Sequence, residues 1–302
     1  MEPFHYLTQA ELADIHQGLS ALRDTKKRTI ELDAADLPLP SMAHRIANWR
    51  RELANGCGFV LIKGVPVESW DLTTIEQFFW CFGQHLGLPG LQNPAGDLLG
   101  HVTDTGASKL DPLVRLYQTN AKIRFHCDGA DVVGLLCCHN ARKGGKSRIA
   151  SSVTVYNELL QHHAQLAQRL HEPMKLDRRN EERSDQTPYV EIQPACYDGE
   201  QLRTFFHADY FRSAARHAGP LTALELELLD TYERIAERED ICYEMQFEPG
   251  DIQLLSNHTV VHARSAYVDA QDDRTTGDPS ATQPTTLRQT SPRHLLRLWL
   301  SL

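Results

Sequence analysis

Short β-rich segments separated by turn signals fill the chain from about residue 98 onward. The first of them are LLGHV, VRLYQT, VVGLLCC and SRIASSV. In PYVEIQPACYDGEQLRTFFHA two strand patterns flank Asp198-Gly199, a strong hairpin signal, and more strands surround the Pro-Gly turn of ICYEMQFEPGDIQLLSNHTVVHARSAYV. Because hairpin-linked strands form antiparallel sheets, we expect a mainly β core with flanking helices (α+β), a barrel or sandwich rather than a doubly wound sheet.

Helical patterns come before these strands and as insertions between them. Thr8 with Glu11 and Thr222 with Glu225 form capping boxes, and we expect a third box from Thr73 with Glu76. The expected helices cover about 9–22, 41–56, 73–87, 155–171 and 222–238, and GFVLIKGVP (58–66) is expected to be a buried strand.

The 302 residues are expected to form one domain, 1–302, with an N-terminal helical segment at 1–56. Residues 270–292 lack hydrophobic periodicity and are rich in Thr, Asp, Pro and Gln, which predicts a flexible surface insertion. No dinucleotide-binding or Walker glycine loop is present to indicate a nucleotide site.

Composition limits the partners of the chain. The net charge of −9 argues against nucleic acid and anionic membrane surfaces, and no apolar stretch approaches the ~18 residues of a membrane span. The N-terminus has no signal-peptide pattern, and the seven scattered cysteines include no C-x-x-C, which fits reduced thiols in a cytoplasm. We therefore expect a cytoplasmic protein with a small-molecule partner, and homo-oligomerisation stays open.

Two His-x-acid triplets stand out as halves of a metal site, His126-Cys127-Asp128 and His207-Ala208-Asp209. Random placement of 15 histidines and 40 acidic residues among 302 positions already gives about two such triplets. The triplet alone is therefore uninformative. Its sequence context and a third ligand have to show whether either triplet belongs to a metal site.

A two-histidine, one-carboxylate site binds iron(II) and needs a histidine on another strand. The segment SNHTVVHAR offers His258 and His262, and strand alternation puts both on one face with Arg264. Single strand histidines are more often hydrogen-bonded core residues than ligands, so the combination of features carries the argument. His126 opens a strand, a glycine pair with a hydroxyl (GGKS) follows it, and an arginine lies in the final strand.

In this order, FHCDGADVVGLLC, GGKSRIAS, PGDIQLLSNHTVVHAR and HLLRLWL resemble the taurine dioxygenase (TauD)/TfdA-like family of Fe(II)- and 2-oxoglutarate-dependent dioxygenases. The resemblance runs from about residue 55 to the C-terminus and includes GFVLIKGVP. It implies a double-stranded β-helix (jelly roll) and an oxidoreductase that uses iron(II), 2-oxoglutarate and O2.

The resemblance also implies roles for individual residues. His126, Asp128 and His262 match the metal ligands, and His258 is expected to be structural. Ser147 and Arg297 match the residues that hold the far carboxylate of 2-oxoglutarate, with Arg264 as second choice. Arg297 lies 35 positions after His262, farther than the family's usual ten to fifteen, and the insertion accounts for the difference. Arg274 has the usual spacing but lies in that insertion. The His207 triplet is not expected to bind metal.

Substrate contacts are expected from Asn120, Lys122 and Arg124, which share a face if the strand before His126 is regular. Segments 177–188 and 205–216 are candidate lids. Asp128 favours hydroxylation, desaturation or ring closure over halogenation, because a glycine or alanine there would leave room for a halide. The expected substrate is small, amino-acid-like or a carboxylate. The alternatives from other classes are a cupin-like metal-binding protein and a zinc hydrolase.

Overall fold

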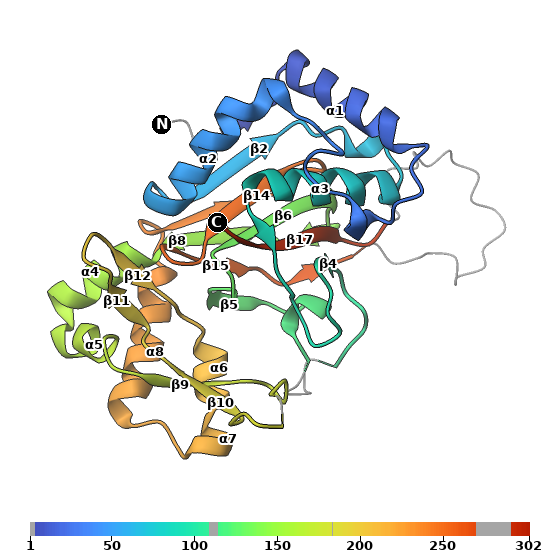
Figure 1. Ribbon diagram of the computed structural model, residues 1–302. Helices are drawn as coiled ribbons and strands as arrows, with labels where there is room; N and C mark the ends of the chain where they lie inside the picture. Colours follow the sequence, from blue (N-terminus) through green and yellow to red (C-terminus); the bar gives the residue numbers. More distant parts are fainter. Residues whose placement is uncertain (1–3, 109–113, 183, 270–290) are drawn as a thin grey trace, which may run out of the picture.

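The computed structural model describes residues 4–108, 114–182, 184–269 and 291–302, and Arg274 with most of the 270–292 insertion lies outside them. Two β-sheets stack face to face, and helices cover both outer faces (Figure 1). The larger sheet contains β1 (Phe4–Tyr6), β2 (Phe59–Lys63), β14 (Ile252–Ser256), β6 (Val132–His139), β17 (His294–Ser301) and β3 (Leu88–Pro89), in that order, and β4 (Leu99–Val102) also pairs with β17. The smaller sheet contains β13 (Cys242–Met245), β8 (Ser147–Ser151), β15 (Val260–Arg264) and β5 (Ile123–His126).

The inner faces of the two sheets form an apolar core. Val133 and Leu255 of the larger sheet pack against Ile149 and Val260 of the smaller one, and all four are buried. Side chains alternate along each strand, so every second residue enters this space. A polar side chain at such a position is therefore held between the sheets.

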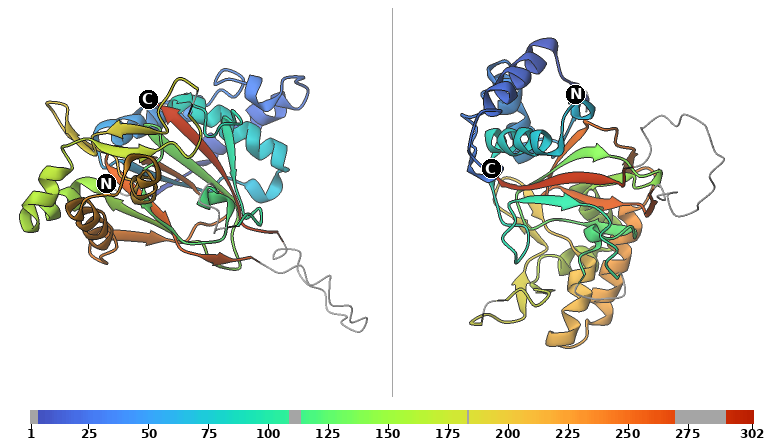
Figure 2. Two further views of the ribbon diagram at one scale, coloured as in Figure 1. Left: turned by 90° about the horizontal axis from the view of Figure 1, so that it is seen from below. Right: turned by 90° about the vertical axis from the view of Figure 1, so that its right-hand side faces the viewer.

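Three helices cover the outer face of the larger sheet. They are α1 (Gln9–Leu22), α2 (Ala43–Asn55) and α3 (Leu72–Leu86), accompanied by the short 3₁₀ helices η1 (Thr29–Glu31), η2 (Pro40–Met42) and η3 (Val67–Ser69). Their apolar stripes bury Ile15, Trp49 and Phe82 against Leu296 and Leu298 of β17 in one cluster. In the right-hand view of Figure 2 these blue and cyan helices lie above the sheets.

The second helical layer covers the smaller sheet. It comprises α4 (Ser152–His162), α5 (Ala164–Arg169), α6 (Ala208–Ser213), α7 (Ala215–Ala218) and α8 (Ala223–Ala236). Leu159 of α4 and Leu228 of α8 pack in one buried cluster with Phe125 of β5 and Val261 of β15. The smaller sheet is thereby fixed between two apolar layers.

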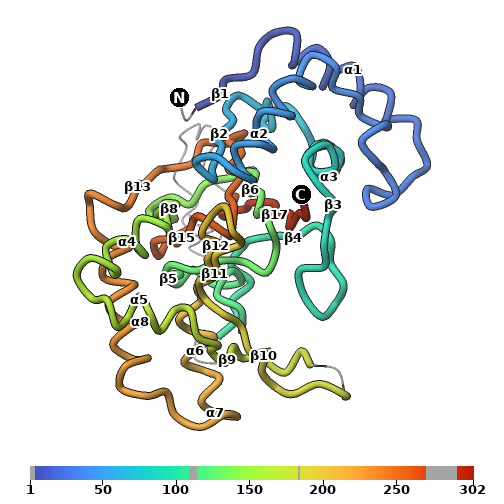
Figure 3. Tube along the Cα trace, turned by 60° about the vertical axis from the view of Figure 1, so that its left-hand side comes forward, coloured from blue at the N-terminus to red at the C-terminus, as the bar shows by residue number. Residues whose placement is uncertain are grey.

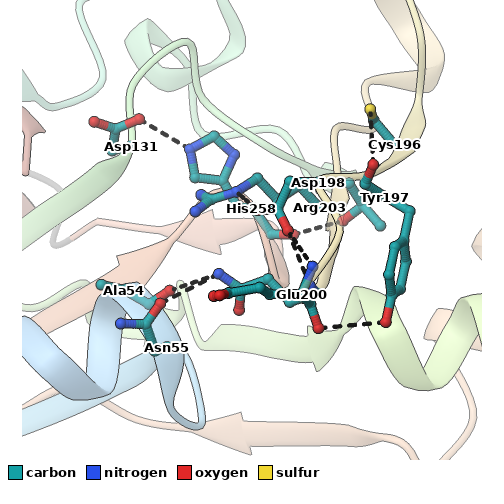
Figure 4. A network of polar contacts seen from close by, with 11 residues as sticks. Ala54, Asn55, Asp131, Cys196, Tyr197, Asp198, Glu200, Arg203 and His258 are labelled. Carbon is teal, nitrogen blue, oxygen red and sulfur yellow. Dashed lines mark hydrogen bonds and ion pairs between the residues drawn. The ribbon is translucent and has the colours of Figure 1, made fainter.

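Three two-stranded ribbons and one further 3₁₀ helix complete the described structure. They are β9 (Met174–Asp177) with β10 (Tyr189–Ile192), β11 (Ala195–Tyr197) with β12 (Leu202–Thr204), β7 (Lys143–Gly144) with β16 (Tyr267–Val268), and η4 (Leu116–Gln118). Figure 4 shows how the β11–β12 hairpin is held by the Asp198–Arg203 ion pair and lies beside Asn55, at the end of α2.

The expected jelly-roll core is confirmed, as are the capping boxes Thr8–Glu11 and Thr222–Glu225 and the hairpin at Asp198-Gly199. The cap predicted at Thr73 is wrong, because Asp71 accepts the Thr74 N–H and starts α3 two residues earlier. The helix expected at 155–171 begins at Ser152 and breaks at His163. In the described part of the chain, no helix is long and apolar enough to cross a membrane.

Candidate metal centre

The site is built where β5 lies beside β15 in the smaller sheet (Figure 3). His126 and His262 are cross-strand partners, and their ring centroids lie 4.2 Å apart. Strand alternation turns Val261 and Ala263 to the helical layer, so that His262 and Arg264 enter the space between the sheets. Alternation thus gives this all-buried strand an apolar side, Val261 and Ala263, and a second side on which Val260 is followed by the two polar residues.

Asp128 completes a set of three donors just after β5. Its Oδ1 lies 3.9 Å from His126 Nε2, and its Oδ2 lies 3.6 Å from His262 Nε2. Two atoms that are each about 2.1 Å from one ion can be no more than about 4.2 Å apart, so both distances suit a shared metal. Asp128 Oδ2 is buried and finds no hydrogen-bond partner among the described residues. The three residues form the one cluster of His, Cys, Asp and Glu in the described chain that could hold a metal ion.

Backbone contacts fix two of these donors. His126 Nδ1 lies 2.9 Å from the carbonyl oxygen of Arg124 and must donate to it, because a carbonyl only accepts; Nε2 is then left unprotonated for a metal. The Asp128 N–H donates to Asn257 Oδ1 at 2.9 Å, and Asn257 Nδ2 donates to the Ala130 carbonyl. Asn257 therefore holds the turn that carries the carboxylate.

The charge states at neutral pH suit metal binding. Burial raises the pKa of the Asp128 carboxyl, but the charge of Arg297 and the imidazoles of His262 and His126 outweigh it and lower the pKa to about 2. Burial, with His126 and Arg297 close by, lowers the pKa of His262 to about 3. An ionised carboxylate and a neutral imidazole are the forms that coordinate iron(II).

Two cavities meet at this site. The outer one has a volume of about 400 Å³ and is lined at its inner end by His126 and Asp128. The inner one lies between the sheets, where Ser147, Arg264 and Arg293 line it together with His262. Arg297 lines both cavities. Its Nε donates to Gln92 Oε1 at 2.7 Å, and its Nη1 lies 3.9 Å from Asp128 Oδ1.

The inner cavity is lined by three buried arginines, Arg264, Arg293 and Arg297, and among its lining residues Asp128 is the one carboxylate. Arg264 is 6% exposed and Arg293 is 3% exposed. Burial and the charge of Arg293 lower the pKa of Arg264 to about 10, and burial lowers that of Arg293 too. Nε and Nη1 of both arginines are buried without a hydrogen-bond partner in the described structure. An anionic ligand in the inner cavity would satisfy such donors.

The GGKS motif forms the wall beside Arg293. Gly145 has φ of +70°, and a Cβ there would stand 2.9 Å from Arg293 Nε. Gly144 has φ of +80°, and a Cβ there would stand 2.2 Å from the Ala266 carbonyl oxygen. The left-handed backbone and the close approach both require glycine. Ser147 follows the pair and donates its hydroxyl to Gln253 Oε1 at 3.1 Å.

The expected substrate contacts are not brought together at the outer cavity. Lys122 is exposed and pairs with Glu237, the residue that follows α8, at 2.6 Å, so its ammonium faces the outer surface. Arg124 lines the cavity but pairs with Glu233 of α8 at 3.0 Å, and Asn120 lines neither cavity. The shared face was expected for a regular strand, but the chain before β5 is the 3₁₀ helix η4 and a bend, which lack the alternation of a strand.

Sequence reasoning missed Arg293, Asn257 and Gln92, and it set His207 aside. His207 lines the outer cavity, its ring stacks on Tyr210 with centroids 3.8 Å apart, and it lies 5.1 Å from the His126 ring. Its triplet partner Asp209 is not part of the metal cluster found among the described residues. His258 also lies outside that cluster and pairs with Asp131 at 2.9 Å (Figure 4). Of the missed residues, only Arg293 had a sequence signal, as the other arginine near the last strand.

Cys127 lies between two of the donors in sequence but not in space. Its side chain is buried in the cluster that faces the helices, and burial raises its thiol pKa to about 12. Cys127 therefore points away from the metal donors.

The chain is similar in sequence to known proteins. The family model described as "Taurine catabolism dioxygenase TauD, TfdA family" matches residues 22–299. The chain is 30% identical to FR-33289 synthase of Streptomyces rubellomurinus (strain ATCC 31215), over 98% of this chain and 84% of that protein. It is 27% identical to the taurine hydroxylase-like protein SAT17 of Stachybotrys chartarum, over 97% of this chain and 73% of that protein.

Solved structures share the fold at low identity. Asparagine oxygenase in complex with Fe(II), 2S,3S-3-hydroxyasparagine and succinate superposes with a TM-score of 0.74 at 15% identity, over 99% of this chain and 93% of the other. The non-heme iron oxygenase OrfP in complex with Fe and alpha-ketoglutaric acid gives a TM-score of 0.66 at 15% identity, over 99% and 94%.

Proposed function

The chain belongs to the TauD/TfdA family of dioxygenases, and we propose that it hydroxylates an unactivated C–H bond of a small amino-acid-like or carboxylate substrate. The reaction is that of an iron(II)- and 2-oxoglutarate-dependent dioxygenase, with succinate and CO2 as co-products. The observation that carries the proposal is the convergence of His126, Asp128 and His262 where a cavity of about 400 Å³ meets a second cavity between the sheets. The relatives crystallised with hydroxylated asparagine and hydroxylated arginine support an amino-acid-like substrate.

We assign the metal to His126, Asp128 and His262, whose donor set and buried, unpartnered carboxylate oxygen fit it. Three donors on one face leave the remaining positions of the ion open to ligands. Iron(II) bound there supplies, with 2-oxoglutarate and O2, the oxidising power that converts C–H into C–OH. The chain holds the donors rigid through the Arg124 carbonyl and Asn257 and keeps the Asp128 carboxylate ionised with Arg297.

We assign the far carboxylate of 2-oxoglutarate to Arg293, with Ser147 and Arg264 beside it. Arg293 and Arg264 present unsatisfied, buried N–H donors to the inner cavity, and a carboxylate satisfies such donors bidentately. Ser147 turns its hydroxyl from Gln253 to the carboxylate when that ligand is present. This assignment replaces the expected Arg297, whose guanidinium is already held by Gln92 and lies beside Asp128.

Arg297 then acts at the end of both cavities that lies beside the metal ligands. Its guanidinium lies over the rings of Tyr117 at 4.6 Å and Trp299 at 5.0 Å, which keep it extended toward Asp128. In this position it stabilises the charged carboxylate and contacts the outer cavity that receives the substrate.

Desaturation or ring closure would use the same residues, and product analysis separates them from hydroxylation. A cupin-like metal-binding protein or a zinc hydrolase has no need of two buried guanidinium groups behind the metal. That pair favours the oxygenase over both. The small-molecule substrate is the partner that this site calls for, and we place the reaction in the cytoplasm, with all seven cysteines unpaired.

The decisive experiment is an anaerobic titration of the iron(II)-loaded protein with 2-oxoglutarate. We expect a metal-to-ligand charge-transfer band, followed by succinate release when O2 and substrate candidates are added. Absence of the band at every pH tested would remove the proposal. Zinc-dependent hydrolysis without succinate would identify the hydrolase instead.

A further inference from the structure

Trp299, in the last strand of the larger sheet, brings an indole ring into the space between the sheets. Leu296 and Leu298 of β17 pack against the outer helices, so strand alternation turns Arg297 and Trp299 to the opposite face. There Trp299 packs against the apolar cluster between the sheets and lines the outer cavity, as Asp128 does. The ring is therefore on the side of β17 that faces the metal donors.

The ring lies beside the turn that carries Asp128. A Cβ built on Gly129, the next residue, would stand 3.7 Å from Cζ3 and 3.9 Å from Cη2 of the Trp299 indole. Arg297 is a second link, because its Cζ lies 5.0 Å from the Trp299 ring centroid and its Nη1 lies 3.9 Å from Asp128 Oδ1. Trp299 and Asp128 therefore share two immediate neighbours.

The indole N–H and the carboxylate each lack a partner that the other can supply. Trp299 Nε1 and Asp128 Oδ2 are both buried and have no hydrogen-bond partner in normal geometry among the described residues. An indole N–H only donates and an ionised carboxylate oxygen only accepts, and leaving either one unpaired in a buried place is unfavourable. Burial raises the pKa of the Asp128 carboxyl, the charge of Arg297 and the two imidazoles lower it, and the Trp299 indole lowers it further as a nearby hydrogen-bond donor. The indole N–H is therefore close to the carboxylate without being fully bonded to it.

The other contacts of Asp128 leave the orientation of its carboxylate open. Asn257 accepts the Asp128 N–H and so holds the backbone of the turn. It does not fix rotation about the Cβ–Cγ bond, which is broad for aspartate. Arg297 Nη1, at 3.9 Å, is beyond hydrogen-bond distance of Oδ1. A donor on a rigid ring, such as the Trp299 indole, can hold the plane of the carboxylate.

We propose that Trp299 is a positioning residue of the metal site, and that its indole N–H donates to the Asp128 oxygen that does not bind the metal. The inference rests on the proposed function, which supplies the metal. The bond holds the carboxylate as a ligand through one oxygen, so that it does not take a second position on the ion that the co-substrate and O2 require. Hydrogen-bonded partners of this kind orient metal ligands, and their removal typically weakens metal binding about 10- to 100-fold.

Two tryptophan variants test the proposal through iron affinity. Trp299→Phe removes the N–H and keeps an aromatic ring, and we expect the iron(II) dissociation constant, measured by anaerobic equilibrium dialysis, to rise about tenfold. Trp80→Phe is the matched control, since Trp80 Nε1 donates to the Leu32 carbonyl at 2.9 Å on the helical side of the larger sheet. It also removes one buried indole hydrogen bond, and it should leave iron affinity unchanged. Circular dichroism and thermal unfolding establish that each variant is folded.

A measurement on the unmodified chain tests the hydrogen bond itself. The sequence has four tryptophans, so protein labelled with ¹⁵N at the indole gives four Nε1–H resonances. We expect one of them to move downfield on titration with zinc(II), a diamagnetic metal that the same donors bind, and to stop moving at one equivalent. Manganese(II) should broaden that resonance more than the others, which identifies it as Trp299 without a variant.

The outcomes separate this proposal from the proposed function. Unchanged iron affinity in Trp299→Phe, equal loss in both variants, or an indole resonance that does not move with zinc overturns the proposal, even when the 2-oxoglutarate charge-transfer band forms. Weaker iron binding in Trp299→Phe alone, together with the zinc-dependent shift, supports it. If the loss and the shift occur but no band forms, the tryptophan contact stands and the oxygenase is removed. A wild-type chain that binds no metal removes both.

Discussion

His126 and His262 face each other across neighbouring antiparallel strands, with ring centroids 4.2 Å apart and no residue between them. Each Nε2 lies within 4 Å of a different oxygen of Asp128. The two strands come from segments 136 positions apart in sequence, so the site exists only once the smaller sheet has formed.

Replacing His262 by alanine is expected to abolish stoichiometric iron binding. The substitution removes one of three donors and leaves the buried Asp128 carboxylate with one partner fewer. We expect iron affinity to fall at least 100-fold, measured by equilibrium dialysis with metal analysis. His258→Ala, which removes a histidine of the same segment outside the cluster, should keep the iron. Equal iron loss in both variants would contradict the assigned ligands.

The stability of the metal-free protein is expected to depend on pH through His262. Its pKa is about 3 in the folded chain, against 6.5 for an ordinary histidine, because the imidazole is buried. Between these pH values the unfolded chain binds a proton that the folded chain does not, so stability is fully present above about pH 6.5 and falls as the pH drops. Relative to His262→Gln, the wild type should lose roughly 1.4 kcal/mol per pH unit within this window. Urea unfolding of both proteins at pH 7, 6 and 5 measures the difference, and parallel curves would exclude the effect.

Arg293→Gln is expected to weaken 2-oxoglutarate binding with iron binding intact. A charge-assisted, buried hydrogen bond contributes about 1.5–3 kcal/mol, which corresponds to about 10- to 150-fold in the dissociation constant. The charge-transfer titration measures this loss. Arg297→Gln tests whether Arg297 holds the far carboxylate instead. Because this substitution removes the cation beside Asp128, we expect it to weaken iron binding more than 2-oxoglutarate binding. The reverse order of effects would restore Arg297 as the main contact of the far carboxylate.

Gly145→Ala is expected to act on the co-substrate site beyond its effect on stability. Gly145 and Gly96 both have positive φ, but a Cβ at Gly145 meets Arg293 Nε whereas a Cβ at Gly96 meets nothing within 4 Å. Both alanine variants should lose about 1–2 kcal/mol of folding free energy to the left-handed backbone. Only Gly145→Ala should also raise the dissociation constant of 2-oxoglutarate, by displacing Arg293. An equal effect of both variants on that constant would show that Gly145 does not position the arginine.

Thiol modification should spare the site. Cys57 and Cys196 are exposed, whereas Cys127 is buried with its thiol pKa raised to about 12. Iodoacetamide at pH 8 is therefore expected to label Cys57 and Cys196 first and to leave iron binding unchanged, as mapped by peptide mass spectrometry. Early labelling of Cys127 in the folded protein would mean that the turn between the two ligands opens.

Local signals in the sequence were sufficient for part of this structure. The capping boxes at Thr8 and Thr222 and the turn at Asp198-Gly199 depend on residues three or four positions apart, and they form as predicted. The same pattern at Thr73 was wrong because Asp71 offers a competing cap two residues earlier, and sequence alone does not rank the two. Strands β13 and β14 are joined by a turn yet belong to different sheets, because burial against distant strands decides their pairing.

The metal set could be proposed from sequence because its ordered motifs are specific when taken together. Arg293 was missed because the prediction required an arginine within a strand, and Arg293 lies just before β17. Asn257 and Gln92 contact Asp128 and Arg297 across long sequence distances that no local pattern encodes.

The placement of β17 has a consequence for the order in which the chain acquires its structure. In the larger sheet β17 lies between β6 and the edge strands, and Arg297 pairs with Leu135, 162 positions earlier. Contacts this distant in sequence form slowly, because the entropy cost of closing a long loop comes before the stabilising contacts form. Until β17 docks, β6 presents an unpaired apolar edge, and Arg293 and Arg297 are absent from their places. A chain in which β17 is not docked therefore lacks the proposed contacts to 2-oxoglutarate, and we expect binding of 2-oxoglutarate to stabilise the folded chain against unfolding.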